Sequence, residues 1–388
     1  MGGLTIQLIY NAKIISEDKI IENGWLIIDD NEIKEIGVGN PAHRNYHKTI
    51  DLDNLYLAPG LIDIHCHGGC GYDVMDNEEG VLEKISKYKL KNGVTGWLAT
   101  PLTAPPEELE SACKRINNAI ESKNNTNLLG AHVEGPFISQ AKKGAQNSEF
   151  IRVGAIKEIN NWIDILGEYL RIVTLAPEKP GAEAIIQELK YNNTLVATAH
   201  TAANYKEMSE AIELGVEQAS HFYNGMTGFH HREPGTVGAF LDSKNTTMEI
   251  IADGIHLHPA TIRITFKIVG AERLILITDA MRAAGMEDGV YDLGGLNVTI
   301  KNGEARLENG NLAGSTLKLI NAVKFIYNNT ELNLVDSWKL ASYNPAKRLG
   351  LDNIYGSLKV GKIANLVAFN ENFSIKNIWL EGDDQIVK

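Results

Sequence analysis

The sequence lacks the features that mark membrane, disulfide-rich and nucleic-acid-binding proteins. Three cysteines, Cys66, Cys70 and Cys113, are too few for a disulfide framework in 388 residues. No apolar run reaches the roughly 18 residues that a membrane span requires. Acidic residues outnumber basic ones by 49 to 37. The net charge of −12 argues against nucleic acid as a partner, because a phosphate backbone requires a basic surface.

Little at the N-terminus suggests export. Met1-Gly2-Gly3-Leu4-Thr5 has no basic stretch leading into an apolar segment, so we do not expect a secretory signal. Together with reduced thiols, this favours a cytoplasmic protein. Cys66 and Cys70 are separated by an interval unlike that of a zinc knuckle, and we expect them to be structural rather than metal ligands.

What is present is enough apolar sequence to bury a large core. Hydrophobic residues make up 44% of the chain and charged residues 22%, as in a water-soluble globular protein. The length suits one large α/β barrel with a smaller companion domain. A small phosphorylated substrate remains compatible with the acidic charge, since one or two local cations can hold it.

Both ends of the chain have the pattern of short β-strands. Apolar runs of strand length, with turn sequences between them, are Gly24–Ile28 and Glu32–Ile36 near the start of the chain and Leu366–Phe369 and Ile375–Leu380 near its end. We therefore expect a small β-sandwich domain built from both termini, residues 1–58 and 347–388. Two unrelated terminal hairpins are the alternative.

The middle of the chain, residues 59–346, alternates short apolar strands with helical stretches, which predicts a (β/α)8 barrel of the TIM type. An open, doubly wound sheet is the alternative, weakened by the lack of a glycine-rich phosphate fingerprint after the first strand. A β-hairpin insertion is expected near residues 289–314. The eight strand candidates are Leu61–Ile64, Val94–Ala99, Leu128–Val133, Ile172–Leu175, Leu195–Ala199, Glu217–Ser220, Glu249–Ala252 and Leu274–Ile277.

Polar side chains follow these strands at the end where barrel enzymes carry their active sites. Residues able to bind metal or to move protons stand at five strand ends: His65, His67, Glu134, His200, His221 and Asp279. The two histidines at positions i and i+2 of an extended segment point to the same side and can face one ion. The repetition of such residues at so many strand ends predicts a metal centre.

The ligand types narrow the choice of metal. Imidazole with carboxylate suits zinc, iron or a similar transition metal, and suits magnesium or calcium poorly. Four histidines and Glu134 are more than one catalytic ion takes while keeping an open position, so two ions bridged by a hydroxide and Glu134 fit better. One filled site with a spare histidine pair is the alternative. Asp279 is either a further ligand or, as its place on the eighth strand favours, the general base; an aspartate capping the next turn is the structural alternative.

The motifs around these residues resemble a known family. Pro59-Gly60-Leu61-Ile62-Asp63-Ile64-His65-Cys66-His67-Gly68 resembles the opening of the amidohydrolase superfamily. The later segments are similar to one family within it, the N-acetylglucosamine-6-phosphate deacetylases, over nearly the whole chain and in the same order. They include His132-Val133-Glu134-Gly135-Pro136-Phe137, Ala199-His200-Thr201, His221-Phe222-Tyr223-Asn224-Gly225-Met226, Ile251-Ala252-Asp253-Gly254-Ile255-His256, Thr278-Asp279-Ala280-Met281 and Leu312-Ala313-Gly314-Ser315.

The resemblance implies roles for individual residues. Glu134, His200 and His221 would hold the metal that every member needs, and His65 with His67 would add a second ion. Asp279 would be the general acid/base, and His256 would polarise the acetyl carbonyl. The sugar phosphate would be held by Asn224, the Gly225 backbone, Arg232, and the loop Leu312, Ala313 and Gly314, with Ala145 and Gln146 lining the same pocket.

Arg232 lies in a basic island, Gly228-Phe229-His230-His231-Arg232-Glu233, and its guanidinium suits a phosphate. An ordinary solvated loop is the alternative. In the family this arginine reaches the substrate of the neighbouring subunit, which implies a homodimer. Two departures from the family pattern, Gly225 in place of an alanine and Asn365 in place of an aspartate, put no chemistry in doubt; Cys66 between the metal histidines has no assigned role.

The expected reaction is hydrolysis of N-acetyl-D-glucosamine 6-phosphate to D-glucosamine 6-phosphate and acetate, in amino-sugar catabolism. A metal-activated hydroxide would attack the carbonyl, and Asp279 would carry the proton to the nitrogen. The alternatives are a deacetylase for the galactosamine isomer, a cyclic-amide hydrolase, and a non-catalytic sugar-phosphate binding protein. Cyclic-amide hydrolases commonly bridge their metals with a carboxylated lysine, whereas Glu134 holds that position here.

Overall fold

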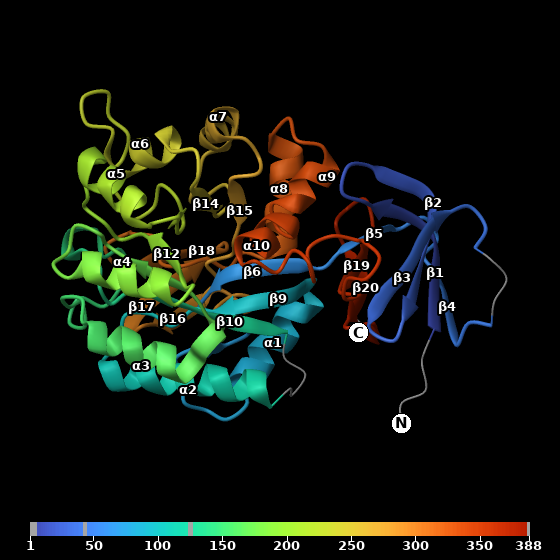
Figure 1. The fold of residues 1–388 in the computed structure, drawn as a ribbon, viewed down its shortest axis with the longest axis horizontal. Helices are drawn as coiled ribbons and strands as arrows, with labels where there is room; N and C mark the ends of the chain where they lie inside the picture. Colours follow the sequence, from blue (N-terminus) through green and yellow to red (C-terminus); the bar gives the residue numbers. More distant parts are fainter. Residues whose placement is uncertain (1–5, 42–44, 123–126, 386–388) are drawn as a thin grey trace. The chain divides into compact units, whose positions relative to one another are not determined.

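The computed structural model describes residues 6–41, 45–122 and 127–385 (Figure 1). The N-terminal Met1–Thr5, on which the expectation about export rests, lies outside these ranges. The chain divides into two compact units. The first combines Met1–Ile62, Lys89–Gly96 and Leu319–Lys388, and the second combines Asp63–Tyr88 and Trp97–Lys318. The domain bounds expected from the sequence, 1–58 with 347–388 and 59–346, stay a prediction.

The first unit contains an eight-stranded sheet built from both ends of the chain. Its strands are β1 (Ile6–Ile15), β2 (Ile20–Asp29), β3 (Glu32–Val38), β4 (Lys48–Asp51), β5 (Tyr56–Pro59), β19 (Leu366–Phe369), β20 (Ile375–Leu380) and β21 (Asp383–Gln385). The order is β21-β20-β19-β5-β1-β2-β3, with β4 paired to β1. The antiparallel pairing of β19 with β5 joins the termini. The prediction of one sheet domain is therefore confirmed, and the alternative of two unrelated hairpins is wrong.

Apolar residues at alternate positions build the core of this unit, because successive side chains of a strand point to opposite faces. Leu26 and Ile28 of β2, Leu366 of β19 and Trp379 of β20 are fully buried together. Three helices belong to the same unit: α8 (Leu319–Asn329), α9 (Leu334–Lys339) and α10 (Tyr343–Arg348). The Trp338 indole of α9 donates a hydrogen bond to the Pro59 carbonyl at 2.9 Å.

A parallel barrel carries the candidate site. Its strands follow one another in the order β15-β14-β13-β12-β11-β10-β9-β6. Their bounds are β6 (Leu61–Cys66), β9 (Val94–Ala99), β10 (Leu128–Glu134), β11 (Leu170–Leu175), β12 (Leu195–Thr198), β13 (Gln218–Ala219), β14 (Thr247–Ile250) and β15 (Leu274–Leu276). All eight predicted strands are present, which confirms the (β/α)8 prediction, although β11 and β14 begin two positions earlier than expected.

Backbone contacts just beyond the strands close the barrel. Cys66 and Ala280 form a parallel bridge, and the Asp279 amide donates to the His65 carbonyl at 3.0 Å. The first and last strands thus meet beside the residues expected to be catalytic. The strands are buried on both faces because helices cover the outside, which explains their continuous apolar sequences.

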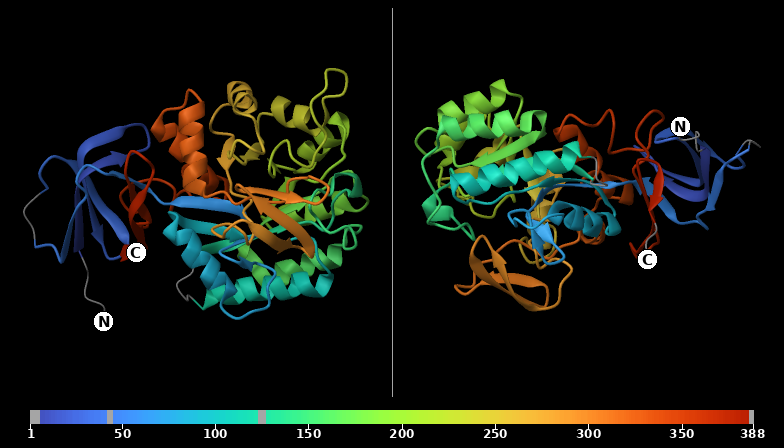
Figure 2. Two further views of the ribbon diagram at one scale, coloured as in Figure 1. Left: turned by 180° about the vertical axis from the view of Figure 1, so that it is seen from behind. Right: turned by 90° about the horizontal axis from the view of Figure 1, so that it is seen from below.

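The covering helices lie around the barrel in Figures 1 and 2. They are α1 (Val81–Lys91), α2 (Pro106–Glu121), α3 (Ile156–Leu166), α4 (Ala182–Tyr191), α5 (Tyr205–Leu214), α6 (Gly235–Asp242) and α7 (Pro259–Val269). Their starts follow ordinary helix chemistry: α2 begins with Pro106 at its first position, and Asn204 with Glu207 forms a capping box at α5. No helix in the described part of the chain is both long and apolar enough to cross a membrane.

The segment after β15 forms a small antiparallel sheet, drawn in orange in Figure 2. It has three strands, β16 (Gly289–Leu293), β17 (Leu296–Lys301) and β18 (Glu304–Leu307), so the expected hairpin gains a third strand. Val298 and Ile300 pack with Leu102 and Met281. This packing fixes the loop that follows β18, at residues 311–314, beside the mouth of the barrel.

Candidate active site

The site residues stand where strands end and the backbone turns. Glu134 is the last residue of β10, and His67 directly follows β6. His200, His221 and Asp279 adopt φ angles of 47°, 30° and 49°. Non-glycine residues in this left-handed region are uncommon and store local strain, and they concentrate at functional sites. The turn at each of these three residues brings its polar side chain into one cluster.

The carboxylate of Glu134 is the centre of the cluster. Its Oε1 atom lies 2.8 Å from Nε2 of His221, 3.3 Å from Nε2 of His200 and 3.7 Å from Nε2 of His65. Its Oε2 atom lies 3.5 Å from Nε2 of His67. Burial alone would raise the pKa of Glu134, but the surrounding imidazoles hold this pKa well below its usual range. Glu134 therefore remains an anion.

Asp279 lies on the other side of the same cluster. Its Oδ1 atom is 3.0 Å from Nε2 of His67 and 3.7 Å from Nε2 of His65. Burial raises the pKa of Asp279, but the hydrogen bond from His67 and the nearby histidines outweigh it, so the pKa is lowered. The side chain keeps 11% of its surface exposed. A partly open, anionic carboxylate beside a cluster of histidines that could bind a metal can both contact an ion and exchange a proton.

The far side of each histidine ring is held by a hydrogen-bond acceptor. The Nδ1 atoms of His67, His200 and His221 donate to the carbonyl oxygens of Thr100, Lys142 and Asn224, at 2.9, 2.9 and 3.2 Å respectively. Nδ1 of His65 donates to the Glu249 carboxylate at 2.8 Å. Such partners fix the tautomer and direct the Nε2 lone pair of a metal-ligating histidine. All four rings are therefore oriented as ligands.

The donor set fits a transition metal. Nε2 of His65 is buried and has no hydrogen-bond partner among the described residues. Two ligand atoms about 2.1 Å from one tetrahedral ion lie roughly 3.4 Å apart, and the Nε2–carboxylate separations of 2.8 to 3.7 Å fall around that value. His65, His67 and Asp279 form one possible ligand group, and His65, Glu134 and His221 form another.

The sequence analysis missed Glu249. This residue lies in the middle of β14, is completely buried, and contacts His65. A charged residue at the start of the otherwise apolar predicted strand Glu249–Ala252 was the available signal. Gln146, which was expected only to line the pocket, also contacts the cluster directly, because its Nε2 donates to Oε2 of Glu134 at 2.6 Å.

A cavity of about 400 Å³ opens above the cluster. This volume is within the usual range for a small-molecule site. Most of the residues expected to bind substrate line the cavity: Ala145, Gln146, Asn224, Gly225, His256, Leu312 and Gly314. His67, Glu134, His200, His221 and Asp279 line it too, whereas His65 is completely buried and outside the lining.

His256 reaches the cavity from the loop after β14. Its Nδ1 atom lies 2.7 Å from Oδ2 of Asp253, and Oδ1 of Asp253 accepts from the His256 backbone amide at 2.8 Å. Burial raises the pKa of Asp253, but the hydrogen bond and charge of His256 outweigh this effect and lower it. Asp253 thus anchors the imidazole at both its backbone and its ring.

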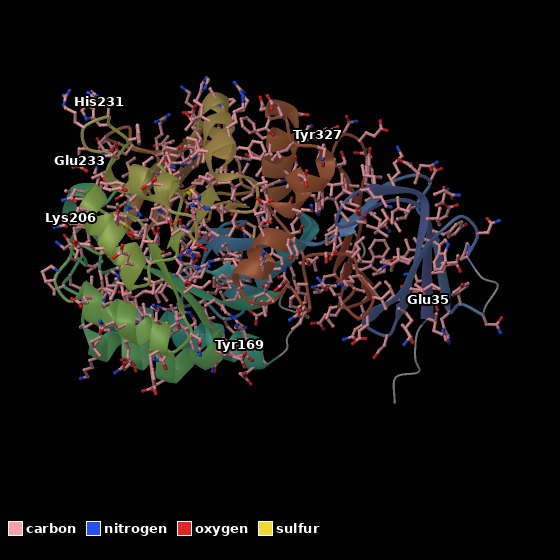
Figure 3. The ribbon with its side chains drawn as sticks, turned by 45° about the horizontal axis from the view of Figure 1, so that its top comes forward. Glu35, Tyr169, Lys206, His231, Glu233 and Tyr327 are labelled. Carbon is pink, nitrogen blue, oxygen red and sulfur yellow. The ribbon has the colours of Figure 1, made fainter. Side chains whose placement is uncertain are left out.

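Two residues expected to bind substrate are not in the cavity lining. Ala313 is completely buried and packs with Met281 and Ala305, so it supports the loop from behind. Arg232 is exposed, and its Nη1 donates to Nε2 of His231 at 2.8 Å. Figure 3 shows His231 and Glu233, its two chain neighbours, on a projecting loop. Arg232 therefore does not reach the cavity of its own chain.

Comparison with known proteins identifies the family to which this chain belongs. The model of the Amidohydrolase family matches residues 56–383, so the chain belongs to that family of metal-dependent amide hydrolases. Within it, the chain is similar to an N-acetylglucosamine-6-phosphate deacetylase of Vibrio furnissii, at 41% identity over 86% of this chain and 84% of the relative. It is similar also to an N-acetylgalactosamine-6-phosphate deacetylase of Escherichia coli O157:H7, at 40% identity over 94% and 96% of the two chains.

A solved structure gives the same result. An N-acetyl-D-glucosamine-6-phosphate deacetylase variant from Mycobacterium smegmatis, in complex with N-acetyl-D-glucosamine-6-phosphate, superposes with a TM-score of 0.92 at 30% identity. The match covers 98% of this chain and 99% of that one. The resemblance stated from the motifs is therefore confirmed over the whole fold.

Proposed function

We propose that this protein hydrolyses the acetamide of N-acetyl-D-glucosamine 6-phosphate, giving D-glucosamine 6-phosphate and acetate. The observation that carries the proposal is the anionic Glu134 with four histidine Nε2 atoms 2.8 to 3.7 Å from its two oxygens, at the floor of a cavity about 400 Å³ in volume. The relatives named above support the choice of substrate.

The metal centre takes zinc or iron, in one or two ions per subunit. Glu134, His200 and His221 would hold one ion, and His65 with His67 would hold a second. A divalent ion bound here supplies a Lewis acid for the acetyl carbonyl and lowers the pKa of the attacking water. One ion with a spare histidine pair is the other possible loading.

Asp279 moves the proton. Its Oδ1 atom is 3.0 Å from His67, and its side chain faces the cavity. It takes a proton from the attacking water while the oxygen bonds to the carbonyl carbon. It then returns that proton to the amide nitrogen as the C–N bond breaks, so that the amine leaves neutral and the acetyl group leaves as acetic acid, which gives its remaining proton to solvent and becomes acetate.

His256 stabilises the charge that develops on the carbonyl oxygen. The Asp253 carboxylate, 2.7 Å from Nδ1, holds the imidazole at the cavity wall. From there the ring can act as a donor to the oxyanion, and a donor of this kind contributes about 10²–10³ in rate.

The sugar phosphate lies between the Asn224–Gly225 turn and the Leu312–Gly314 loop, with Ala145 and Gln146 on the cavity wall. Lys142 is the one lysine or arginine of the described chain that lines the cavity. We propose that Arg232 of a second copy completes the phosphate site in a homodimer. Exposed Phe229, Ile264 and Ile268 line a groove near the Arg232 loop, as expected for a surface that a second copy covers.

The galactosamine isomer is the second candidate substrate, because one relative is named for it at 40% identity. Amine release from both acetylated hexosamine 6-phosphates, measured with and without chelator, tests the proposal. We expect chelator-sensitive turnover with higher kcat/KM for the glucosamine compound. Equal or higher kcat/KM for the galactosamine compound would change the substrate, and turnover of neither would overturn the proposed function.

A further inference from the structure

Glu249 occupies the interior of the barrel beneath the cluster. It is a completely buried carboxylate on β14, and both of its oxygens are engaged. Oε1 accepts from Nε2 of Gln218 at 2.7 Å, and Oε2 accepts from Nδ1 of His65 at 2.8 Å and from the His221 backbone amide at 3.2 Å. A buried carboxylate is costly unless its charge is compensated, so a role in the chemistry of its neighbours is expected.

His65 differs from the other three histidines in the partner of its Nδ1 atom. The others donate to neutral backbone carbonyl oxygens, whereas His65 donates to the Glu249 carboxylate. A hydrogen bond to an anion is stronger than one to a neutral oxygen, and it increases the basicity of the opposite ring nitrogen. That nitrogen, Nε2 of His65, is the buried atom with no hydrogen-bond partner within the described ranges.

His65 also has a pivotal position in the cluster. Its Nε2 atom lies 3.7 Å from Oε1 of Glu134 and 3.7 Å from Oδ1 of Asp279, between the two carboxylates. A second divalent ion would add two positive charges to a buried space that would already hold one ion. The anionic side chain of Glu249, one imidazole away, reduces that electrostatic cost.

We propose that Glu249 is a positioning residue that makes His65 a ligand and thereby determines whether the His65–His67 side of the centre holds an ion. This inference rests on the metal centre of the proposed function and adds the residue that sets its loading. The competing explanation is that Glu249 only ties β13 to β14 through Gln218 and the His221 amide. The two explanations differ in which ion they affect.

Glu249→Gln tests the proposal, because it keeps the shape and removes the charge. Metal-free protein is titrated with zinc against a chromophoric chelator, and zinc per subunit is measured by atomic emission. We expect two zinc ions in the wild type. In Glu249→Gln the affinity for the first zinc ion should stay within about threefold of the wild-type value. The affinity for the second should fall by about 10–100-fold, the usual effect of losing the hydrogen-bond partner of a metal ligand.

Two further variants isolate the effect. Glu178→Gln is a matched control, because Glu178 also accepts two hydrogen bonds, from Thr201 Oγ1 at 2.6 Å and the Ala202 amide at 2.7 Å, near the cluster. Neither bond involves a ligand imidazole, so this variant should bind both ions like the wild type. In a His65→Ala background, Glu249→Gln should have no additional effect on zinc binding, because its action passes through His65.

The outcomes separate the explanations. Equal weakening of both ions, a further loss in the His65→Ala background, or a wild type that binds a single zinc would each overturn the proposal. Metal-free Glu249→Gln that unfolds at lower denaturant concentration and binds both ions normally would favour the strand-tying role. A protein that shows the expected zinc pattern and releases no amine would overturn the proposed function and leave the role of Glu249 intact.

Discussion

Oδ1 of Asp279 lies 3.0 Å from Nε2 of His67, so the proposed proton carrier and a proposed metal ligand are in hydrogen-bond contact. The contact holds the carboxylate at the edge of the cluster, where Asp279 lines the cavity. It also keeps Asp279 ionised, since its pKa is lowered once the hydrogen bond and charge of the histidines outweigh burial.

Replacing Asp279 by Asn should lower kcat by about 10²–10⁴, the usual contribution of a positioned general acid–base group. The loss corresponds to about 3–5 kcal/mol of transition-state stabilisation. Steady-state kinetics measures it, with zinc content and substrate affinity, from isothermal titration, as controls. A variant that keeps near-native turnover would remove Asp279 from the proton-transfer step.

Zinc should bind the metal-free protein more tightly as pH rises from about 6 to about 8, because ligand histidines must lose their protons. Burial lowers the pKa of His65, His67 and His221, but the nearby carboxylates outweigh burial and raise all three pKa values. Zinc therefore displaces protons at neutral pH. Competition titrations at several pH values measure the zinc affinity, and proton release into weak buffer measures the displaced protons. A zinc affinity that does not depend on pH would contradict this prediction.

The stability of the metal-free protein should change in the opposite direction. A histidine whose pKa is raised by folding stabilises the folded state fully below its unfolded pKa of about 6.5. That contribution is lost as pH rises through the raised folded pKa of His65, His67 and His221. Urea unfolding of metal-free protein should therefore show falling stability across this range, while saturating zinc should abolish or reverse the trend.

Arg232 can be tested by mixing two inactive variants. Arg232→Ala should raise KM strongly for the phosphorylated substrate, and Asp279→Asn should lower kcat. If the arginine acts across a dimer, unfolding and refolding the two variants together creates mixed dimers, in which one site has Asp279 from one subunit and Arg232 from the other. Activity should then reappear. Mixtures that stay as inactive as the separate variants would place Arg232 outside the neighbouring site.

Gly135, directly after Glu134, should not tolerate a side chain. Its φ is +78°, and an added Cβ would lie 2.2 Å from Oγ1 of Thr103. Gly135→Ala should lower the free energy of unfolding by about 1–3 kcal/mol because of the strained backbone conformation. It should also lower the affinity for the ion that Glu134 would hold. Adding Thr103→Ala removes the steric part and should recover some zinc affinity. Zinc affinity and urea unfolding of the single and double variants measure both effects.

The sequence predicted the barrel well because its strands are short, apolar and separated by helical stretches, and because polar residues follow them at one end. Glu249 was missed for a physical reason. Strand-end positions indicate chemistry, whereas Glu249 lies inside β14 and its partners, His65 and Gln218, come from two other strands. Arg232 is a related case: sequence shows a basic loop, but the distance of that loop from its own cavity depends on the folded chain.

The seam of the barrel has a consequence for biosynthesis. Cys66 and Ala280, 214 positions apart, form the bridge that closes the ring of strands. The groups proposed to bind metal and to move protons stand on both sides of it. A growing chain therefore cannot assemble this centre until its eighth strand has left the ribosome, and contacts of such long range form slowly. Metal binding is therefore a late event that follows closure of the barrel, and shorter nascent chains have no catalytic activity.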